Sequence, residues 1–322
     1  MAQTPAELLD PTFPLPLTEP FTTRQAQVAG IRPRDLTRLV ASGHLRRLVK
    51  GVYAPAQCPD TREVRARAVS LFAPPGSVVC DWTAAWLWTG VDHPAAHTSM
   101  PTPDVFRFRG HDRMRNGLTR SGQRWFLPSD VVPFEGDVLV TTPLRTAWDL
   151  GRFSRRIVAI GGMDALARTG EFSLDELVGG VERFRRQRGV VQLRHLAPLV
   201  NGSAESPGES ALRMRWLEAA SLPPPECQIS ITTELGVELY RLDLGLRQLR
   251  FAAEYDGEGW HDSPEQRDHD LTRRTTLRRE FGWHIEVFRK EHVFGQSETA
   301  TDRLIRGVDE ARRTLPARLA GY

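Results

Sequence analysis

Three acidic residues in the C-terminal third of the chain have the spacing of a metal-binding site. The segment YRLDLGLRQLRFAAEYDGEGWH contains Asp243, Glu254 and Asp256. Asp243 lies near the end of one predicted strand, and the other two acids lie two residues apart on the next, so they share a face. The midpoint between Asp243 and Glu254 falls at Gln248 and Leu249. A turn there brings Asp243 beside Glu254.

Carboxylates gathered in this way repel one another, and an unpaired carboxylate among apolar neighbours is costly. Glu254 directly follows Phe251, Ala252 and Ala253, which predicts a buried strand. A divalent cation removes the conflict, because Mg²⁺ takes oxygen ligands and, once bound, polarises a phosphodiester and activates water. We therefore expect Mg²⁺ or Mn²⁺ as cofactor. The alternative is that Arg247, Arg250 or arginines of the following helix neutralise the acids as ion pairs.

The elements that position these acids follow the order αβββαβ. Their predicted bounds are a helix over 209–220, strands over 229–233, 237–244 and 249–255, a helix over 264–280 and a strand over 283–288. The polar stretch NGSAESPGES at 201–210 predicts a boundary before them. We expect a C-terminal domain over residues 205–322.

This segment resembles the PD-(D/E)xK nuclease superfamily, close to the very-short-patch-repair (Vsr-like) endonuclease domains. The matching stretches are SPGESALRMR, RLDLGL, FAAEYDGEGWH and RDHDLTRRTTLRREFGWHIEVFR. The resemblance implies a restriction-endonuclease-like fold and a magnesium-dependent DNA endonuclease, a hydrolase of phosphodiester bonds. It makes Asp243 the metal-binding acid, Glu254 the acid of the following strand, and Glu209 the helix acid that completes the site. Asp256 is expected beside the metal or bound to it through water.

The chain departs from this pattern at the lysine of the motif, whose place is taken by Asp256. Vsr-like domains also lack that lysine, so the departure leaves the general base unassigned. His261 is the candidate, because an imidazole titrates near neutrality. The alternative is a surface histidine in a Gly-rich loop.

Arginines along the predicted helix 264–280 could grip phosphates beside the metal. Arg267, Arg274 and Arg278 fall near one face together with Asp270. The alternative is a solvated face on which Asp270 and Arg274 pair.

The N-terminal segment FTTRQAQVAGIRPRDLTRLVASGHLRRLVKGVYAP reads as helix, turn, helix and hairpin. Thr22 or Thr23 caps a helix ending at Gly30, and Pro33 opens a second one that stops at Gly43. Two short strands then surround Lys50 and Gly51. This is the layout of a winged helix-turn-helix, expected over residues 21–57.

Seven basic residues and one acidic residue lie between Arg24 and Lys50, as expected for a surface that binds phosphates. The candidate DNA contacts are Arg32, Arg34 and Arg38 on the second helix and Arg46, Arg47 and Lys50 on the wing. The alternative is a winged helix that binds protein.

The first ~55 residues and the following region resemble the AbiEi-type antitoxin and transcriptional-regulator family. The matching pieces are FTTRQAQVAG, LVASGHLRRLVKGVYAP and VTTPLRTAWDL. The resemblance implies DNA binding and adds a cognate toxin to the expected partners.

The whole chain has 322 residues with ordinary globular composition, and it reads as an α+β multidomain protein. An extended lead-in over 1–20 precedes the winged helix, and a mixed α/β middle domain covers 58–200. The sequence shows neither a secretory signal nor a membrane span, and its three cysteines predict no disulfide framework. We expect a cytoplasmic protein that binds DNA, with a toxin or repair partner, no membrane contact and an oligomeric state that the sequence leaves open. Two functions compete, an endonuclease in repair or defence and a regulator or antitoxin whose nuclease fold is inactive.

Overall fold

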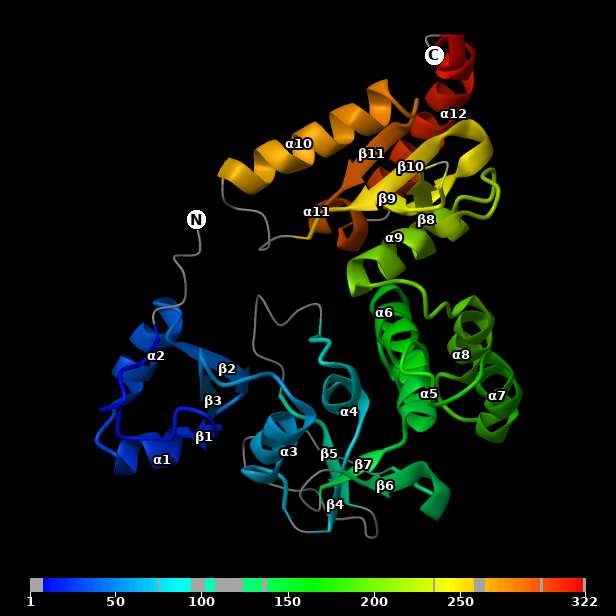
Figure 1. Ribbon diagram of the computed structural model, residues 1–322. Coiled ribbons are helices and arrows are strands. Elements are labelled where there is room, and N and C mark those ends of the chain that lie inside the picture. Colours follow the sequence, from blue (N-terminus) through cyan, green and yellow to red (C-terminus); the bar gives the residue numbers. More distant parts are fainter. Residues whose placement is uncertain are drawn as a thin grey trace. The chain divides into compact units, whose positions relative to one another are not determined.

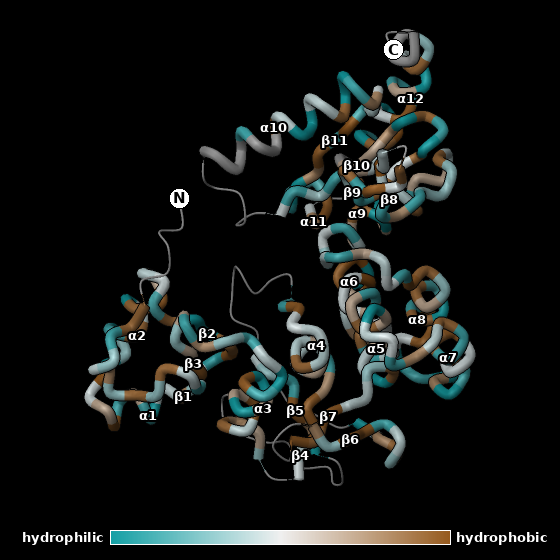
Figure 2. The backbone as a smooth tube through the Cα atoms, in the orientation of Figure 1, coloured by the Kyte–Doolittle hydropathy of each residue, from teal (hydrophilic) through white to brown (hydrophobic). Residues whose placement is uncertain are grey.

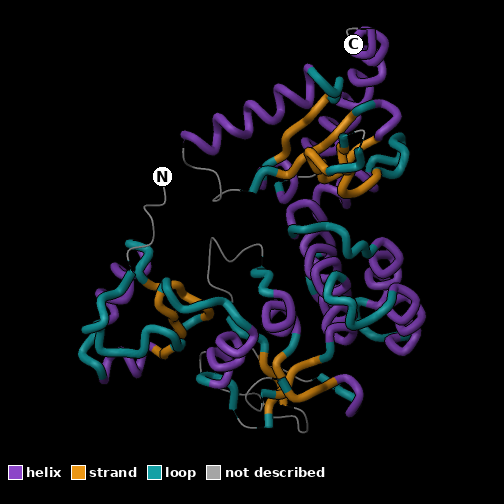
Figure 3. The backbone as a smooth tube through the Cα atoms, in the orientation of Figure 1, coloured by secondary structure: helices purple, strands orange, loops and turns teal. Residues whose placement is uncertain are grey.

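The computed structural model describes residues 8–74, 76–93, 102–107, 124–134, 138–233, 235–257, 264–295 and 298–320 (Figure 1). The chain forms two compact units. One contains Gln3–Ser154 and Thr169–Pro198, and the other contains Arg155–Arg168 and Leu199–Tyr322. Among the described residues, helices occur together with three sheets, which confirms the mixed character of the predicted fold (Figure 3).

The N-terminal part of the first unit is a helix-turn-helix followed by a hairpin. Its elements are β1 (Phe21–Thr22), α1 (Thr23–Val28), α2 (Pro33–Ala41), β2 (Leu45–Val49) and β3 (Val52–Pro55), with sheet order β1-β3-β2. Thr22 caps α1, because its hydroxyl accepts the Gln25 N–H at 3.1 Å. Gly43 ends α2 at φ +80° and Gly51 turns the hairpin at the same φ, a conformation that favours glycine. The predicted layout of this segment is confirmed.

The middle region adds a second sheet and helices to this unit. Its elements are α3 (Arg62–Ser70), β4 (Ser77–Val79), α4 (Asp81–Thr89), β5 (Val105–Arg107), β6 (Val131–Pro133), β7 (Leu139–Thr141), α5 (Pro143–Phe153), α7 (Leu174–Gly179) and α8 (Val190–Leu196). The sheet order is β5-β4-β7-β6. Thr142 caps α5, because its hydroxyl accepts the Arg145 N–H.

Charged side chains form part of the core of this middle region. Asp149 is fully buried, and its carboxylate accepts a hydrogen bond from Arg145 Nε at 2.8 Å. Arg145 also pairs with the buried Asp130, which Arg183 contacts at 2.7 Å through both ends of its guanidinium. These pairs connect α5 to the segment before β6. They are costly to break, because removing one partner would leave a buried charge unpaired.

The second unit contains the predicted αβββαβ order, which is confirmed. Its elements are α6 (Arg156–Ala167), α9 (Pro207–Glu218), β8 (Glu226–Thr232), β9 (Glu238–Leu246), β10 (Phe251–Tyr255), α10 (Pro264–Arg279), β11 (His284–Phe288), α11 (Lys290–Phe294) and α12 (Glu298–Ala320). The sheet order is β11-β10-β9-β8. Within this sheet the β10–β11 pair is parallel, and the β9–β10 and β8–β9 pairs are antiparallel.

Helices cover both faces of this sheet. Trp216 of α9 lies 5.7 Å from the ring of Phe251, and Gly307 lets α12 approach the same ring. Ala252 instead packs with Leu277 of α10. Because successive strand residues point to opposite faces, α10 lies on one face and α9 with α12 on the other. Figure 2 shows apolar residues along β11 and mostly polar ones along α10.

Helix α6 packs against α9, so the second unit takes in a helix from before its predicted start. Arg213 of α9 donates to Asp164 of α6 at 2.7 Å, and both side chains are buried. The predicted domain limits stay a prediction. In the part of the chain that the structure describes, no helix is long and apolar enough to cross a membrane.

Candidate functional site

Three carboxylates of the second unit come from a helix start and two adjacent strands. Glu209 lies in the first turn of α9, which Ser206 caps by accepting the Glu209 N–H at 3.1 Å. Asp243 lies on β9 and Glu254 on β10. The antiparallel register pairs Ala253 with Leu244, so Glu254 and Asp243 are the next opposed positions. A turn over 247–249 makes this fold-back where it was predicted.

Asp243 is the most electrostatically perturbed of these acids. Burial raises its pKa to about 8, with repulsion from Glu209 and, more weakly, Glu254, although a hydrogen bond from the Tyr255 N–H at 2.8 Å opposes the shift. Burial also raises the pKa of Glu209, whose Oε2 accepts from Gln228 Nε2 at 2.8 Å. A gathering of acids that raises their pKa values is a common property of functional sites.

Glu254 is 6% exposed and is held by arginines of α10. Arg273 donates to both of its oxygens, at 2.8 Å to Oε1 and 3.1 Å to Oε2. Arg274 lies 3.6 Å from Oε2 and 3.9 Å from Asp256, which Arg289 approaches at 3.7 Å. Glu254 therefore forms an ion pair with helix arginines, which the sequence left open as the alternative to a divalent cation.

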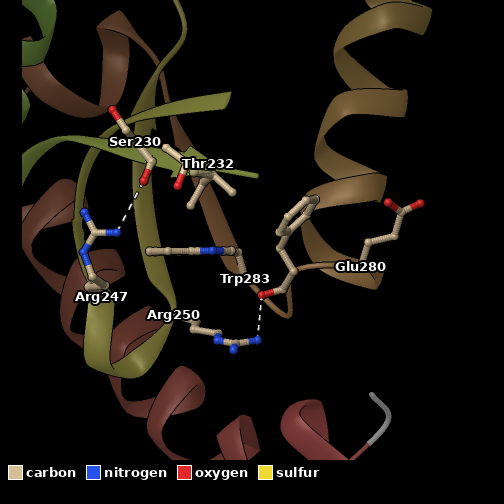
Figure 4. A pocket seen from close by; sticks show the side chains of 8 residues that line it. Ser230, Thr232, Arg247, Arg250, Glu280 and Trp283 are labelled. Atoms are coloured by element: carbon tan, nitrogen blue, oxygen red, sulfur yellow. Dashed lines mark hydrogen bonds between the residues drawn. The ribbon is translucent and has the colours of Figure 1, made fainter. Parts of the chain in front are cut away.

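The two turn arginines do not fill this role. Arg247 pairs with Glu226 at 3.3 Å and donates to the Ser230 carbonyl at 3.3 Å. Arg250 donates to the Phe281 carbonyl at 2.9 Å. Both line a hollow of about 520 Å³ beside Trp283 (Figure 4). They fix the turn that places Asp243 opposite Glu254.

Arg273 was missed by the sequence analysis, which selected a different stripe of α10. It precedes the buried Leu277 by one helical turn, and that spacing places it over the sheet. Arg274 faces the carboxylates and is only 23% exposed. Arg278 donates to the Ile285 carbonyl at 3.0 Å. Both arginines therefore make contacts inside the unit, and their predicted contacts with phosphates stay a prediction.

Two predicted residues cannot be placed. His261 lies outside the described residues, and of Arg267 only the helical backbone is described.

The donor set of Asp243, Glu209 and Glu254 is all oxygen, which suits a hard divalent cation. Within the described ranges, no three His, Cys, Asp or Glu side chains are arranged to hold a metal ion. Asp243 and Glu209 could hold one, since neither takes part in an ion pair with any described residue. Glu254 could join them only after its pair with Arg273 opens.

The second candidate surface is on the winged helix. Arg34, Thr37, Arg38 and Ala41 are exposed at helical spacing on α2, opposite the buried Leu36. This face is free to enter a groove of DNA.

Acidic and aromatic neighbours orient the remaining basic residues. Arg32 and Arg38 flank Asp35, at 2.8 and 3.7 Å, yet their side chains remain 61% and 78% exposed. On the wing, Arg47 lies over the Tyr53 ring and Lys50 is exposed at the hairpin tip.

Arg46, another of the predicted DNA contacts, is less accessible than Arg47 and Lys50 of the wing, and its role stays a prediction. It is half-buried, and its Nη2 donates to the carbonyl of Cys58 in the same unit. Because alternate residues of a strand face opposite sides, Arg46 points inward while Arg47 is exposed.

The two helices and the two-stranded wing define a winged helix-turn-helix protein. Residues 19–56 match the family described as "Transcriptional regulator, AbiEi antitoxin", which supports a DNA-binding regulatory role. Over 279 residues the chain is 33% identical to the uncharacterized proteins MT2308 and Rv2248 of Mycobacterium tuberculosis, strains CDC 1551 / Oshkosh and ATCC 25618 / H37Rv. The alignment covers 85% of this chain and 96% of each relative, so the chain belongs to their family. The AbiEi match ends at residue 56, and the nuclease resemblance stays a prediction.

Proposed function

We propose that the chain binds DNA through its winged helix and hydrolyses phosphodiester bonds in its second unit with a divalent cation. The observation that carries the enzymatic part is the opposed placement of Asp243 on β9 and Glu254 on β10, with Glu209 at the start of α9 close enough to raise the pKa of Asp243. Burial raises the pKa values of Asp243 and Glu209, and repulsion from Glu209 and Glu254 adds to the shift of Asp243.

Mg²⁺ or Mn²⁺, when bound, would polarise the phosphodiester and lower the pKa of a coordinated water. Asp243 and Glu209 would hold the cation through carboxylate oxygens, and Glu254 would add another once its arginine pair opens. Asp256, between Arg274 and Arg289, keeps those two cations beside the site. His261 remains the proposed base.

Cleavage assays on the full chain test this proposal. Supercoiled, linear, single-stranded and mismatched DNA would each be incubated with Mg²⁺, Mn²⁺ or EDTA. We expect cation-dependent cleavage of at least one DNA form. Asp243→Asn should abolish cleavage and leave DNA binding intact, because Asp243 and the winged helix belong to different units. If no DNA form is cut with either cation, the enzymatic part is wrong and DNA binding remains.

A second candidate is a regulator or antitoxin of the AbiEi type whose C-terminal fold is inactive. The pairing of Glu254 with two arginines favours it, because that carboxylate is then a structural counter-ion. This function predicts binding to one DNA sequence without cleavage, and a toxin as protein partner. Footprinting on DNA, with and without Mg²⁺, would separate the two candidates. A cytoplasmic location remains part of both.

A further inference from the structure

We infer that Arg273 occupies Glu254 in place of a divalent cation and has to release it before a cation takes that carboxylate. This inference rests on the proposed metal site. It makes Arg273 a positioning residue that sets the affinity of the site for metal.

The contact between Arg273 and Glu254 is a two-point contact. Both guanidinium nitrogens, Nη1 and Nη2, reach a carboxylate oxygen, at 3.1 and 2.8 Å. This geometry uses the oxygens that a metal would need, and paired charge-assisted hydrogen bonds are among the strongest polar contacts in proteins. Any cation at Glu254 therefore competes with a guanidinium already in position.

The arginine is itself held at the site. Its Nη2 also donates to the carbonyl of Arg241 at 2.7 Å, two residues before Asp243 on the same strand. Arg273 therefore contacts Glu254 of β10 and the backbone of β9, and the backbone contact can remain when Glu254 turns away.

Burial strengthens the ion pair between Arg273 and Glu254. Glu254 is 6% exposed and the Arg273 side chain is 23% exposed, so water screens their attraction weakly. Removing the arginine leaves a buried carboxylate without its main partner, which destabilises the metal-free protein. The same carboxylate becomes a better ligand for an added cation.

Titration of metal-free full-length protein with Mn²⁺, followed by electron paramagnetic resonance of the free ion, tests the inference. The variants are Arg273→Met, which keeps an apolar stem, and Arg273→Lys, which keeps one charge without the two-point contact. Arg279→Met on the same helix is the matched control, because Arg279 is exposed. We expect Arg273→Met to bind Mn²⁺ about tenfold or more tightly than the wild type. Arg273→Lys should fall between them, and the control should match the wild type.

Thermal unfolding supplies a second measurement that needs no activity. In EDTA, Arg273→Met should melt at a lower temperature than the wild type, and Mn²⁺ should raise the melting temperature of the variant more. Adding Asp243→Asn to Arg273→Met should remove the tight binding, which places the cation at this site. If Arg273→Met does not fold, the comparison of Arg273→Lys with the wild type carries the test.

Equal Mn²⁺ affinity in the wild type and both Arg273 variants would overturn the inference and leave the metal site standing. Absence of Mn²⁺ binding in all folded variants would overturn the proposed metal site, and the inference with it.

Discussion

Replacing Asp243 by Asn should stabilise the metal-free protein at alkaline pH. In the folded chain, burial and the neighbouring acids raise the pKa of Asp243 from 3.8 to about 8. The folded state therefore binds more protons than the unfolded state between about pH 4 and about pH 8, and stability falls as the pH rises through that window. Asn carries no charge and can still accept the Tyr255 N–H through its amide oxygen.

The pKa difference sets the size of the effect. A shift from 3.8 to about 8 corresponds to about 6 kcal/mol of unfolding free energy lost by about pH 9. Water reaches part of the Asp243 side chain and screens the repulsion, so we expect a measured gain of about 2 kcal/mol for Asp243→Asn at pH 8.5. At about pH 4 the two proteins should have nearly equal stability, because both then carry a neutral side chain there.

Urea unfolding in EDTA across this pH range measures the difference, and repeating it with Mg²⁺ tests the cation. Mg²⁺ at 100 times its dissociation constant should stabilise the wild type by about 2.7 kcal/mol and leave the variant unchanged. A variant less stable than the wild type at pH 8.5, with no effect of Mg²⁺ on either, would refute the reasoning. It would mean that a positive partner stabilises the Asp243 carboxylate.

Other changes test the remaining parts of the structure. Arg34→Ala and Arg38→Ala should each weaken DNA binding and lower the slope of log K against log salt by about 0.9 for each phosphate that the variant no longer neutralises; equal slopes in filter-binding titrations would remove α2 from the interface. Arg303→Met should lower stability at pH 7 but not below about pH 2 in thermal scans, because His284 and Arg303 lower the pKa of Glu286 to about 2 and their effect ends when Glu286 is protonated. A fragment over 205–322 lacks α6, so it should unfold less cooperatively in urea than the same residues do in the full chain. Equal cooperativity would show that α6 is dispensable.

Local chemistry made much of the fold predictable. Local signals mark the ends and turns of the winged helix. The Thr22 hydroxyl accepts a backbone N–H at the start of α1, and Gly43 and Gly51 adopt the positive φ angles that glycine favours. The sequence between Asp243 and Glu254 has room for one turn, which fixes their register. These features depend on neighbours within a few residues of the chain.

Long-range packing decided what the sequence could not predict. Helix α6 joins the second unit through Asp164 and Arg213, which are 49 residues apart. Arg46 and Arg47 are adjacent and both basic, yet only the pleat of β2 decides which one points inward. Helix α12 was not predicted, although Leu304, Val308 and Ala311 have helical spacing and are fully buried.

Long-range packing also decides which residue neutralises the carboxylate cluster. The cost of a carboxylate in an apolar strand is visible from the strand alone, so Glu254 could be identified at once. Its partner could not, because nearly all of the 43 basic residues are arginines and each could neutralise an acid. The packing of α10 on the sheet selects Arg273 from among them. A site whose Glu254 is neutralised by an arginine can fold without metal, and a cation can take that carboxylate only by displacing the guanidinium. The cation-dependent hydrolysis that we propose for the second unit would therefore depend on the free energy of that exchange.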